Sequence, residues 1–182
     1  MYMELESTRL ELKEISFDDL ENLHELYSIP EVDEFNTLGI PKDIQATRKL
    51  IKPMIEVKDK NPRGAYHWKI VLKDSGEFIG LSGLILSNDK FKLGEIYYKF
   101  LPRFWGNGYA TETAKAIIAC GFDHFKLHKV EAGVATENVN SIKVLEKLGM
   151  TREGLRRKIL PIRGKWVDNY HYAIVEDDPR DY

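Results

Sequence analysis

Two closely spaced glycines, Gly106 and Gly108, offer the clearest chemistry in this sequence. They lie between residues 94–101, which are rich in β-forming aromatic residues, and residues 110–125, which repeat apolar residues at helical spacing. Glycine has no Cβ, so a phosphate can approach the backbone, and the start of a helix adds converging N–H groups and partial positive charge. Residues 106–110, which we call the glycine turn, are therefore predicted to bind a phosphate group.

The residues around the glycine turn do not decide which phosphate-containing ligand it binds. A nucleoside triphosphate site would need the lysine and hydroxyl of G-x-x-x-x-G-K-[ST], and no such run exists here. A dinucleotide site would need glycine or alanine where Thr111 stands, although Glu131 lies about where an acidic ribose ligand would fall. A tight turn between strand and helix that binds nothing is the structural alternative.

Several motifs resemble the GNAT superfamily of acetyl-CoA-dependent N-acetyltransferases. Arg103-x-x-Gly106-x-Gly108 looks like its R/Q-x-x-G-x-G/A signature, and residues 137–150 (ENVNSIKVLEKLGM) are similar to the second motif of its RimJ/RimL branch, the ribosomal-protein N-acetyltransferases and their relatives. The segments LESTRLELKEISFDDLENLHEL, SGEFIG, GEIYYKFLP, GYATETA, REGLRR and GKWVDNYHYAI follow that branch in order. The resemblance spans almost the whole chain, and the order and spacing of the motifs make it specific.

The resemblance implies that acetyl-CoA is the cosubstrate. Its pyrophosphate would bind the signature residues and the amides of the glycine turn, namely Arg103, Gly106, Asn107, Gly108, Tyr109 and Ala110. The pantetheine arm would pair, as an added strand, with the backbone of Phe100, Leu101 and Pro102. A bulge in that strand is expected to aim an N–H at the thioester carbonyl and so stabilise an oxyanion. Asn138 and Ser141 would contact the cofactor from the other side of the cleft.

The implied reaction is direct attack of a primary amine on the thioester. The amine must be neutral, and an N-terminal α-amine, with a pKa near ~8, loses its proton more readily than a lysine amine, with a pKa near ~10.4. We expect Glu95, at the start of the cofactor strand, to take this proton, directly or through water. A solvent-facing position for Glu95 agrees equally well with the sequence.

The group that protonates the leaving thiolate is less obvious. Many members of the superfamily use a tyrosine four residues after the Asn-x-x-Ala/Ser position, and Leu145 stands there in this chain. Ser141 is the candidate for this role, because a hydroxyl both donates and accepts hydrogen bonds. Its structural alternative is a helix N-cap.

Four functions follow from these residues. A protein N-terminal α-amine is the favoured acceptor, and a small amine such as a polyamine, an amino acid or an antibiotic is the second. A non-catalytic acyl-CoA-binding module is a different class, which the missing tyrosine keeps open. A nicotinamide-dependent oxidoreductase is the weakest of the four.

Other conspicuous residues are expected to have structural roles. Cys120 falls on an apolar helix face and is interpreted as a core thiol. His124 and His128 are four residues apart, but no third ligand is evident, so they are expected to cap a helix or face solvent, and no metal site is predicted. Trp105 is expected to pack beside the glycine turn.

Two further groups have weaker signals. The acidic residues Glu31, Asp33 and Glu34 are expected to be solvated, with attraction of a cationic amine as the alternative. Asp168 and Tyr170 match positions often retained in the RimJ/RimL branch, where we expect a mainly structural role and some chance of contact with the acceptor.

The elements that must position these residues follow from periodicity and turn residues. A helix begins at a capping box of Ser16 and Asp19 and ends at Pro30, and residues 41–58 are helical but are expected to split into two short helices at Pro53. Further helices are predicted at 110–125 and 140–148, and strands at 8–15, 67–72, 77–86, 94–101, 129–136, 151–162 and 165–175. This order predicts an α/β (α+β) fold like that of GNAT proteins. It is a mixed, mostly antiparallel sheet of six to seven strands with a central parallel β-α-β unit and helices on both faces, in one domain over residues 1–182.

Composition limits the remaining possibilities. The 182 residues carry 27 Lys plus Arg against 29 Asp plus Glu, a formal charge of −2, which argues against a nucleic-acid-binding protein. The single cysteine excludes a disulfide framework within the chain. No signal peptide and no stretch approaching the ~20 apolar residues of a membrane span is evident, so a cytoplasmic protein is predicted. Apolar residues on the last two strands could support a homodimer.

Overall fold

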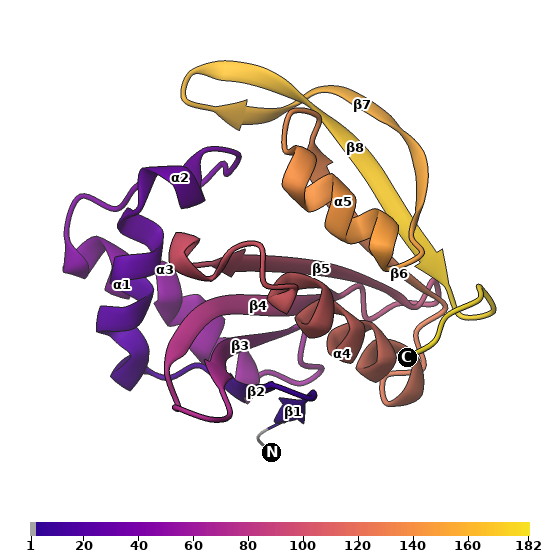
Figure 1. Ribbon diagram of the computed structural model, residues 1–182, viewed down its shortest axis with the longest axis horizontal. Coiled ribbons are helices and arrows are strands. Elements are labelled where there is room, and N and C mark those ends of the chain that lie inside the picture. The colour runs from indigo at the N-terminus through magenta and orange to yellow at the C-terminus, as the bar shows by residue number, and fades with distance from the viewer. Residues whose placement is uncertain (1–2) are drawn as a thin grey trace.

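Eight strands form one sheet in the order β1-β2-β3-β4-β5-β6-β8-β7 in the computed structural model, which describes residues 3–182 (Figure 1). The strands are β1 (Leu5–Glu6), β2 (Leu10–Glu14), β3 (Ala65–Leu72), β4 (Phe78–Leu86), β5 (Leu93–Phe100), β6 (Lys129–Ala135), β7 (Thr151–Ile162) and β8 (Lys165–Val175). Among the strands of residues 3–182, only β5 and β6 are parallel neighbours. The predicted mixed sheet is confirmed, with one strand more than expected, because the two-residue β1 is too short to show a period.

Helices cover both faces of the sheet. The helices are α1 (Leu20–Ser28), α2 (Pro30–Asp33), α3 (Ile44–Glu56), α4 (Tyr109–Asp123) and α5 (Val139–Lys147), with 3₁₀ turns at Phe17–Asp19, Val57–Asp59 and Pro102–Phe104. Helices α1 and α3 pack on one face, and α4 and α5 share the core of the other. No helix in residues 3–182 is long and apolar enough to cross a membrane.

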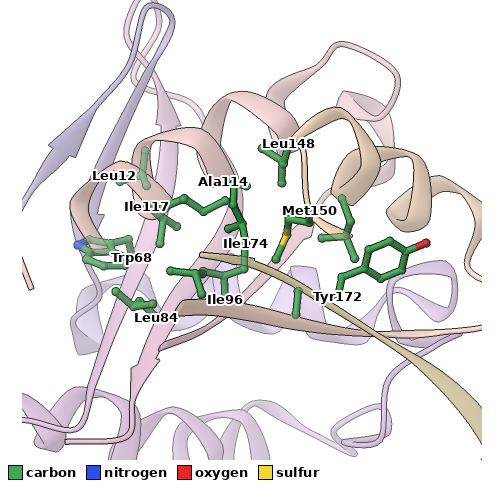
Figure 2. Packing of buried hydrophobic residues seen from close by; sticks show 14 of the residues in the cluster. Leu12, Trp68, Leu84, Ile96, Ala114, Ile117, Leu148, Met150, Tyr172 and Ile174 are labelled. Atoms are coloured by element: carbon green, nitrogen blue, oxygen red, sulfur yellow. The ribbon is translucent and has the colours of Figure 1, made fainter. Parts of the chain in front are cut away.

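Two apolar cores result, one on each face of the sheet. The larger core lies between the sheet and α4 and α5, and Figure 2 shows Trp68, Ile117 and Tyr172 within it. The smaller core lies against α1 and α3 and includes Leu81. Strand β4 supplies both cores, because Leu84 belongs to the larger one. The sheet therefore connects two cores that the helices cover separately.

The first helical segments agree with the sequence in part. The capping box is present, since the Ser16 N–H donates to Asp19 Oδ2 at 2.9 Å. Pro30 ends α1 and begins the short α2. The expected split at Pro53 is wrong, because α3 is one helix through this residue. Ile51 and Ile55, one helical turn apart, are both buried in the smaller core, and their burial favours a continuous helix despite the missing N–H.

Strands β5 and β6 diverge after only three paired residues. Their last parallel pair is Glu95 with Glu131. Beyond this pair, β5 continues to pair with β4 as far as Phe100, and β6 continues to pair with β8 as far as Ala135. We call the opening between the two diverging strands the fork. It leaves one edge of each strand without a neighbouring strand in the middle of the sheet.

The last two strands form a long hairpin at the edge of the sheet (Figure 1). Their predicted bounds agree with the structure. Strand β7 is exposed along most of its length, and the apolar side chains of Leu155, Ile159 and Trp166 are among those that face solvent.

Candidate active site

The glycine turn lies between the end of β5 and the start of α4. Gly106 and Gly108 have φ values of 78° and 80°, in the left-handed region that glycine adopts without strain. Gly108 is the N-cap of α4, and no side chain caps the helix there. A Cβ at Gly106 would meet no atom within 4 Å, so the space beside this residue is open. The N-terminal amides of a 15-residue helix thus adjoin an open backbone turn, which suits a phosphate group.

Side-chain hydrogen bonds hold the segment before the turn. Asn107 Nδ2 donates to the carbonyl oxygens of Phe104 and Trp105, each at 3.1 Å. Trp105 Nε1 donates to the Phe100 carbonyl at 2.8 Å, so the half-exposed indole is fixed to the end of β5, just before the turn. The side chain of Asn107 therefore shapes the turn, and its backbone is the part that remains for a ligand.

Arg9 and Glu112 brace the turn from outside, and the sequence reasoning did not single out either residue. Glu112 accepts from the Arg9 N–H and Nε, each at 2.7 Å, and from the Ser7 hydroxyl at 2.8 Å. Arg9 Nη2 donates to the Asn107 carbonyl at 3.0 Å, and the Arg9 guanidinium lies 4.4 Å from the Tyr109 ring centre. Burial raises the pKa of Glu112, but these hydrogen bonds outweigh it and hold the pKa below its usual value. A carboxylate fixed in this way joins the β1–β2 turn to the first turn of α4.

The side chain of Arg103 pairs with acidic residues outside the glycine turn. Its guanidinium is half-exposed and forms ion pairs with Glu25, at 2.9 Å, and with Glu77, at 3.4 Å. The side chain thus connects α1 with the turn that precedes β4. Its expected contact with the pyrophosphate stays a prediction.

The strand register decides which peptide groups of β5 face the fork. The Leu101 N–H donates to the Ile79 carbonyl at 2.9 Å, so the peptide group of Leu101 points toward β4. Peptide groups alternate sides along an antiparallel strand, so those of Ile96, Tyr98 and Phe100 point away from β4 and toward the fork. A pantetheine arm that pairs with β5 would meet these residues.

This register changes two expectations about the cofactor strand. Leu101 donates to β4 and its carbonyl accepts from the Phe104 N–H at 2.9 Å, while Pro102 has no N–H, so neither presents a donor to the fork. The expected bulge is also absent from β5, whose pairing with β4 is continuous. Register shifts occur instead in the pairing of β3 with β4, at Ile70 and Val71, and at two places in the pairing of β7 with β8.

A pair of hydroxyl groups bridges the fork on the side of α5. The Tyr98 hydroxyl lies 2.9 Å from Ser141 Oγ. Ser141 is not the N-cap of α5, because Asn138 holds that position and its Oδ1 accepts from the Ser141 N–H at 3.2 Å. Leu145 is buried in the larger core and brings no polar atom here. Sequence reasoning missed Tyr98, although the alternation in GEIYYKFL places it on the same face as Ile96 and Phe100.

Glu95 lies where the fork closes. Its side chain is exposed, and alternation along β5 places it on the same face as Tyr97 and Lys99, opposite to Tyr98. The structure therefore places Glu95 and Ser141 on different sides of the fork. This is the arrangement that a base acting on the amine and a donor acting on the sulfur would need.

Charged residues gather on the Glu95 side of the fork. Lys99 is half-buried and its Nζ lies 4.9 Å from the ring centre of Tyr27. Burial lowers the pKa of Lys99 to about 8, although the Asp33 carboxylate opposes the shift. Asp33 is only 7% exposed, which corrects the expectation of a solvated residue, and its Oδ2 lies 3.6 Å from Arg163 Nη2 at the tip of the β7–β8 hairpin.

The remaining acidic residues of this segment are solvated. Glu31 and Glu34 are exposed, as expected. Neither side chain is paired with Lys99 or Arg163 in the ion pairs of residues 3–182.

Most of the other candidates have structural contacts. Cys120 is buried and its Sγ lies 3.8 Å from Met3 Sδ, and burial raises the pKa of its thiol to about 11, so a reactive thiolate is not favoured. His124 packs edge-on against Phe125, and His128 Nδ1 lies 2.9 Å from Glu176, so the two histidines have different partners.

Asp168 and Tyr170 are held within the last strands. Asp168 Oδ1 accepts from the Lys158 N–H at 2.7 Å, and the Tyr170 ring lies 4.5 Å from the Arg152 guanidinium. These contacts fit the structural role that was predicted.

Glu131, Glu153 and His171 form a cluster at the closed end of the fork. One ligand atom from each lies within 4.8 Å of the others, a spacing that could hold a cation. Lys129 Nζ, however, lies 2.7 Å from Glu153 and 3.7 Å from Glu131. The lysine ammonium therefore supplies the positive charge that these carboxylates need, and the cluster is an ion-pair network.

The chain is similar to known acetyltransferases in both sequence and structure. Residues 9–151 match the family model described as "Acetyltransferase (GNAT) domain". The chain is 30% identical over 173 residues to "Uncharacterized N-acetyltransferase p20" of Bacillus licheniformis, covering 94% of this chain and 96% of that protein. It is also 30% identical to the crystal structure of a GNAT-family acetyltransferase from Bacillus anthracis, with a TM-score of 0.84 and coverage of 96% and 99% of the two chains.

Two more distant structures share the fold at 21% identity, each with a TM-score of 0.81. One is a spermidine N-acetyltransferase from Vibrio cholerae in complex with CoA and spermine, with 93% of this chain and 96% of that chain covered. The other is a ribosomal-protein-S5-alanine acetyltransferase from Vibrio fischeri, with 98% and 100% covered.

Proposed function

The chain belongs to the GNAT family and is an acetyl-CoA-dependent N-acetyltransferase, and from this premise we propose that its acceptor is a protein N-terminal α-amine. The structural relatives do not decide between acceptors, because one is named for spermidine and one for a ribosomal-protein alanine at the same 21% identity. The two kinds of acceptor differ in what they need from the acceptor side of the fork, which is the face of the sheet that α1 and α3 cover.

The charges on that side carry the proposal. The glycine turn begins α4, so the cosubstrate approaches from the α4 face and an acceptor would enter from the opposite face, where Lys99 lies. Asp33, the buried carboxylate there, already faces two cations, Lys99 and Arg163. A polyamine brings several ammonium groups and would need carboxylates that are not neutralised. A peptide N-terminus brings at most one positive charge and an uncharged backbone, so this side repels it less than a polyamine.

The proposed reaction gives each residue of the fork a chemical role. Acetyl-CoA supplies the activated acetyl group. The amides of the glycine turn would hold the pyrophosphate, and the Tyr98 or Phe100 N–H would donate to the thioester carbonyl and stabilise its developing negative charge. Glu95 would accept the proton of the amine, and Ser141 would donate a proton to the sulfur. Asn138 would contact the cofactor from the start of α5.

A small amine is the second candidate. Glu31 and Glu34 are exposed carboxylates on or just after α2, beside the same entrance, and could attract a polycation. This candidate would use the same fork and the same glycine turn. It differs only in what holds the acceptor.

The deciding experiment measures thiol release from acetyl-CoA with a panel of N-terminal peptides, lysine peptides, polyamines and aminoglycosides, with mass spectrometry of each product. We expect peptide-dependent thiol release and one added acetyl group on the α-amine. Lys99→Gln is expected to raise turnover of spermidine relative to the peptide, whereas the matched change Lys115→Gln on the outside of α4 should leave that ratio unchanged. Acetylation of polyamines alone by the unmodified protein would contradict the proposal, and tight CoA binding without turnover would restore the binding-module interpretation.

A further inference from the structure

The tyrosine that many superfamily members place on the helix after the fork is replaced here by Leu145, which is 1% exposed and lies in the larger core. A different tyrosine, Tyr98, reaches the same helix from the opposite side of the fork. It comes from β5, and its hydroxyl lies 2.9 Å from Ser141 Oγ in the first turn of α5. We propose that Tyr98 is a positioning residue that aims the Ser141 hydroxyl at the leaving thiolate, a role that rests on acetyl transfer taking place in the fork.

The position of Tyr98 along the strand supports this role. Its peptide group faces the fork, as do those of Ile96 and Phe100, while its side chain extends along the face that carries α4 and α5. The thioester of an arm that enters from the glycine turn and pairs with Phe100 would come next to Tyr98, two residues further along the strand. The hydroxyl pair therefore lies on the sulfur side of the fork, and Glu95 lies on the amine side.

The hydrogen-bonding capacity of a hydroxyl explains how one residue can aim the other. Each hydroxyl has one hydrogen to donate. If Tyr98 donates to Ser141 Oγ, the hydrogen of Ser141 must point to another acceptor, and the fork offers the sulfur. Burial raises the pKa of Tyr98 to about 12, against a smaller opposing effect of the Ser141 hydrogen bond, so the phenol keeps its proton at neutral pH and remains a donor.

The proton balance of the step is complete. The amine nitrogen forms a bond to the carbonyl carbon, the C–S bond breaks, and its electron pair leaves on the sulfur. Ser141 gives its proton to the sulfur and is reprotonated, through water, by the proton that the amine releases, while Tyr98 keeps its own proton and holds the serine hydroxyl in place. The proton released by the amine passes to Glu95 or to water, so the products are an amide and a free thiol.

A double-mutant cycle tests this inference. Values of kcat and of KM for acetyl-CoA are measured for Tyr98→Phe, Ser141→Ala and the double variant, with whichever amine turns over in the acceptor panel. A different acceptor would then contradict the proposed function without affecting this inference. Tyr97→Phe is the matched control, because it removes a buried hydroxyl on the other face of the same strand, 2.7 Å from His67 Nδ1.

We expect Tyr98→Phe to lower kcat about tenfold or more, with KM for acetyl-CoA nearly unchanged. In the Ser141→Ala background the same change should have no further effect, because Tyr98 acts only through that serine. Ser141→Thr keeps a hydroxyl and should retain most of the activity. Tyr97→Phe should leave kcat within about twofold.

Three results would overturn the inference. One is an equal loss for Tyr98→Phe with and without Ser141, which would show an independent role. Another is a change confined to KM for acetyl-CoA. It would show that the hydroxyl pair only closes the fork and that acetyl-CoA must break this hydrogen bond to bind. The third is full activity of Ser141→Ala, which remains informative even where Tyr98→Phe does not fold.

Discussion

Glu95 and Glu131 are a natural pair for testing the base, because they are register partners on the two strands that meet at the closed end of the fork. Glu131 lies 3.7 Å from Lys129 and 3.3 Å from His171, so its carboxylate already has partners. Glu95→Gln is expected to lower kcat about 10²-fold at neutral pH, the usual contribution of a positioned base. The loss should shrink as the pH rises past ~8, because an α-amine is then neutral without assistance. Steady-state kinetics over a pH series measure both effects.

Glu131→Gln is the control for that series and should keep activity within about twofold, since its charge neutralises Lys129 and not the amine. If Glu95→Gln has unchanged activity and an unchanged pH profile, the assignment of Glu95 is wrong, and the amine loses its proton to water.

At the residue scale, residue type and spacing predict positions that require a particular backbone conformation. They do not predict contacts between residues that are far apart in the sequence. Gly106 and Gly108 could be identified because only glycine adopts their left-handed geometry without strain. The burial of Asp33 could not be predicted, since the cation at its carboxylate, Arg163, is 130 residues away in the sequence (163 − 33 = 130). Tyr98 was missed for the same reason, because its partner lies on a different element.

At the element scale, the first turn of α4 depends on a strand turn that lies far from it in sequence. Glu112 is the link, because it accepts two hydrogen bonds from Arg9, which also donates to the Asn107 carbonyl. Glu112→Ala removes this brace and lets the amides of the glycine turn lose their common direction. We expect KM for acetyl-CoA to rise about fivefold, the equivalent of about 1 kcal/mol, with a smaller change in kcat.

Lys115→Ala is the control on the same helix. Its ion pair is with Asp181, whose side chain is 84% exposed, and exposed pairs contribute little. Titration of CoA binding by calorimetry measures the same effect without turnover. Equal affinities of Glu112→Ala and Lys115→Ala for CoA would show that the brace does not shape the site.

Periodicity and turn residues predicted the bounds of most elements to within a residue or two, because many of them bury one face and expose the other. The turn residues Arg163 and Gly164 separate the two strands of the last hairpin, and the bounds of both strands were predicted correctly. The continuous helix through Pro53 was not predicted. Burial of Ile51 and Ile55 in the smaller core outweighs the cost of the backbone hydrogen bond that Pro53 cannot donate. The fork could not be predicted either, since pairing of β5 with β6 ends without any change in the pattern of either strand.

At the scale of the whole molecule, the two cores raise the question of whether the chain unfolds as one unit. Leu81 and Leu84 are both fully buried on β4, and they belong to different cores, on opposite faces of the sheet. Because these residues share one strand, unfolding of β4 would disrupt the packing of both cores. We therefore propose that residues 1–182 form a single cooperative domain.

Leu81→Ala and Leu84→Ala test this proposal. Each substitution should lower the free energy of unfolding by about 2–5 kcal/mol, since each leaves a cavity in a packed core. Unfolding changes tryptophan fluorescence chiefly through the buried Trp68 of the larger core, because Trp105 and Trp166 are already 46% and 65% exposed in the folded chain. Far-ultraviolet circular dichroism follows the helices of both cores. If the domain is cooperative, both signals shift to the same lower denaturant midpoint in both variants. A Leu81→Ala variant that loses helix signal while Trp68 stays in its native environment would instead show that α1 and α3 unfold separately. The acceptor side of the fork would then lose its cover before the cosubstrate side does.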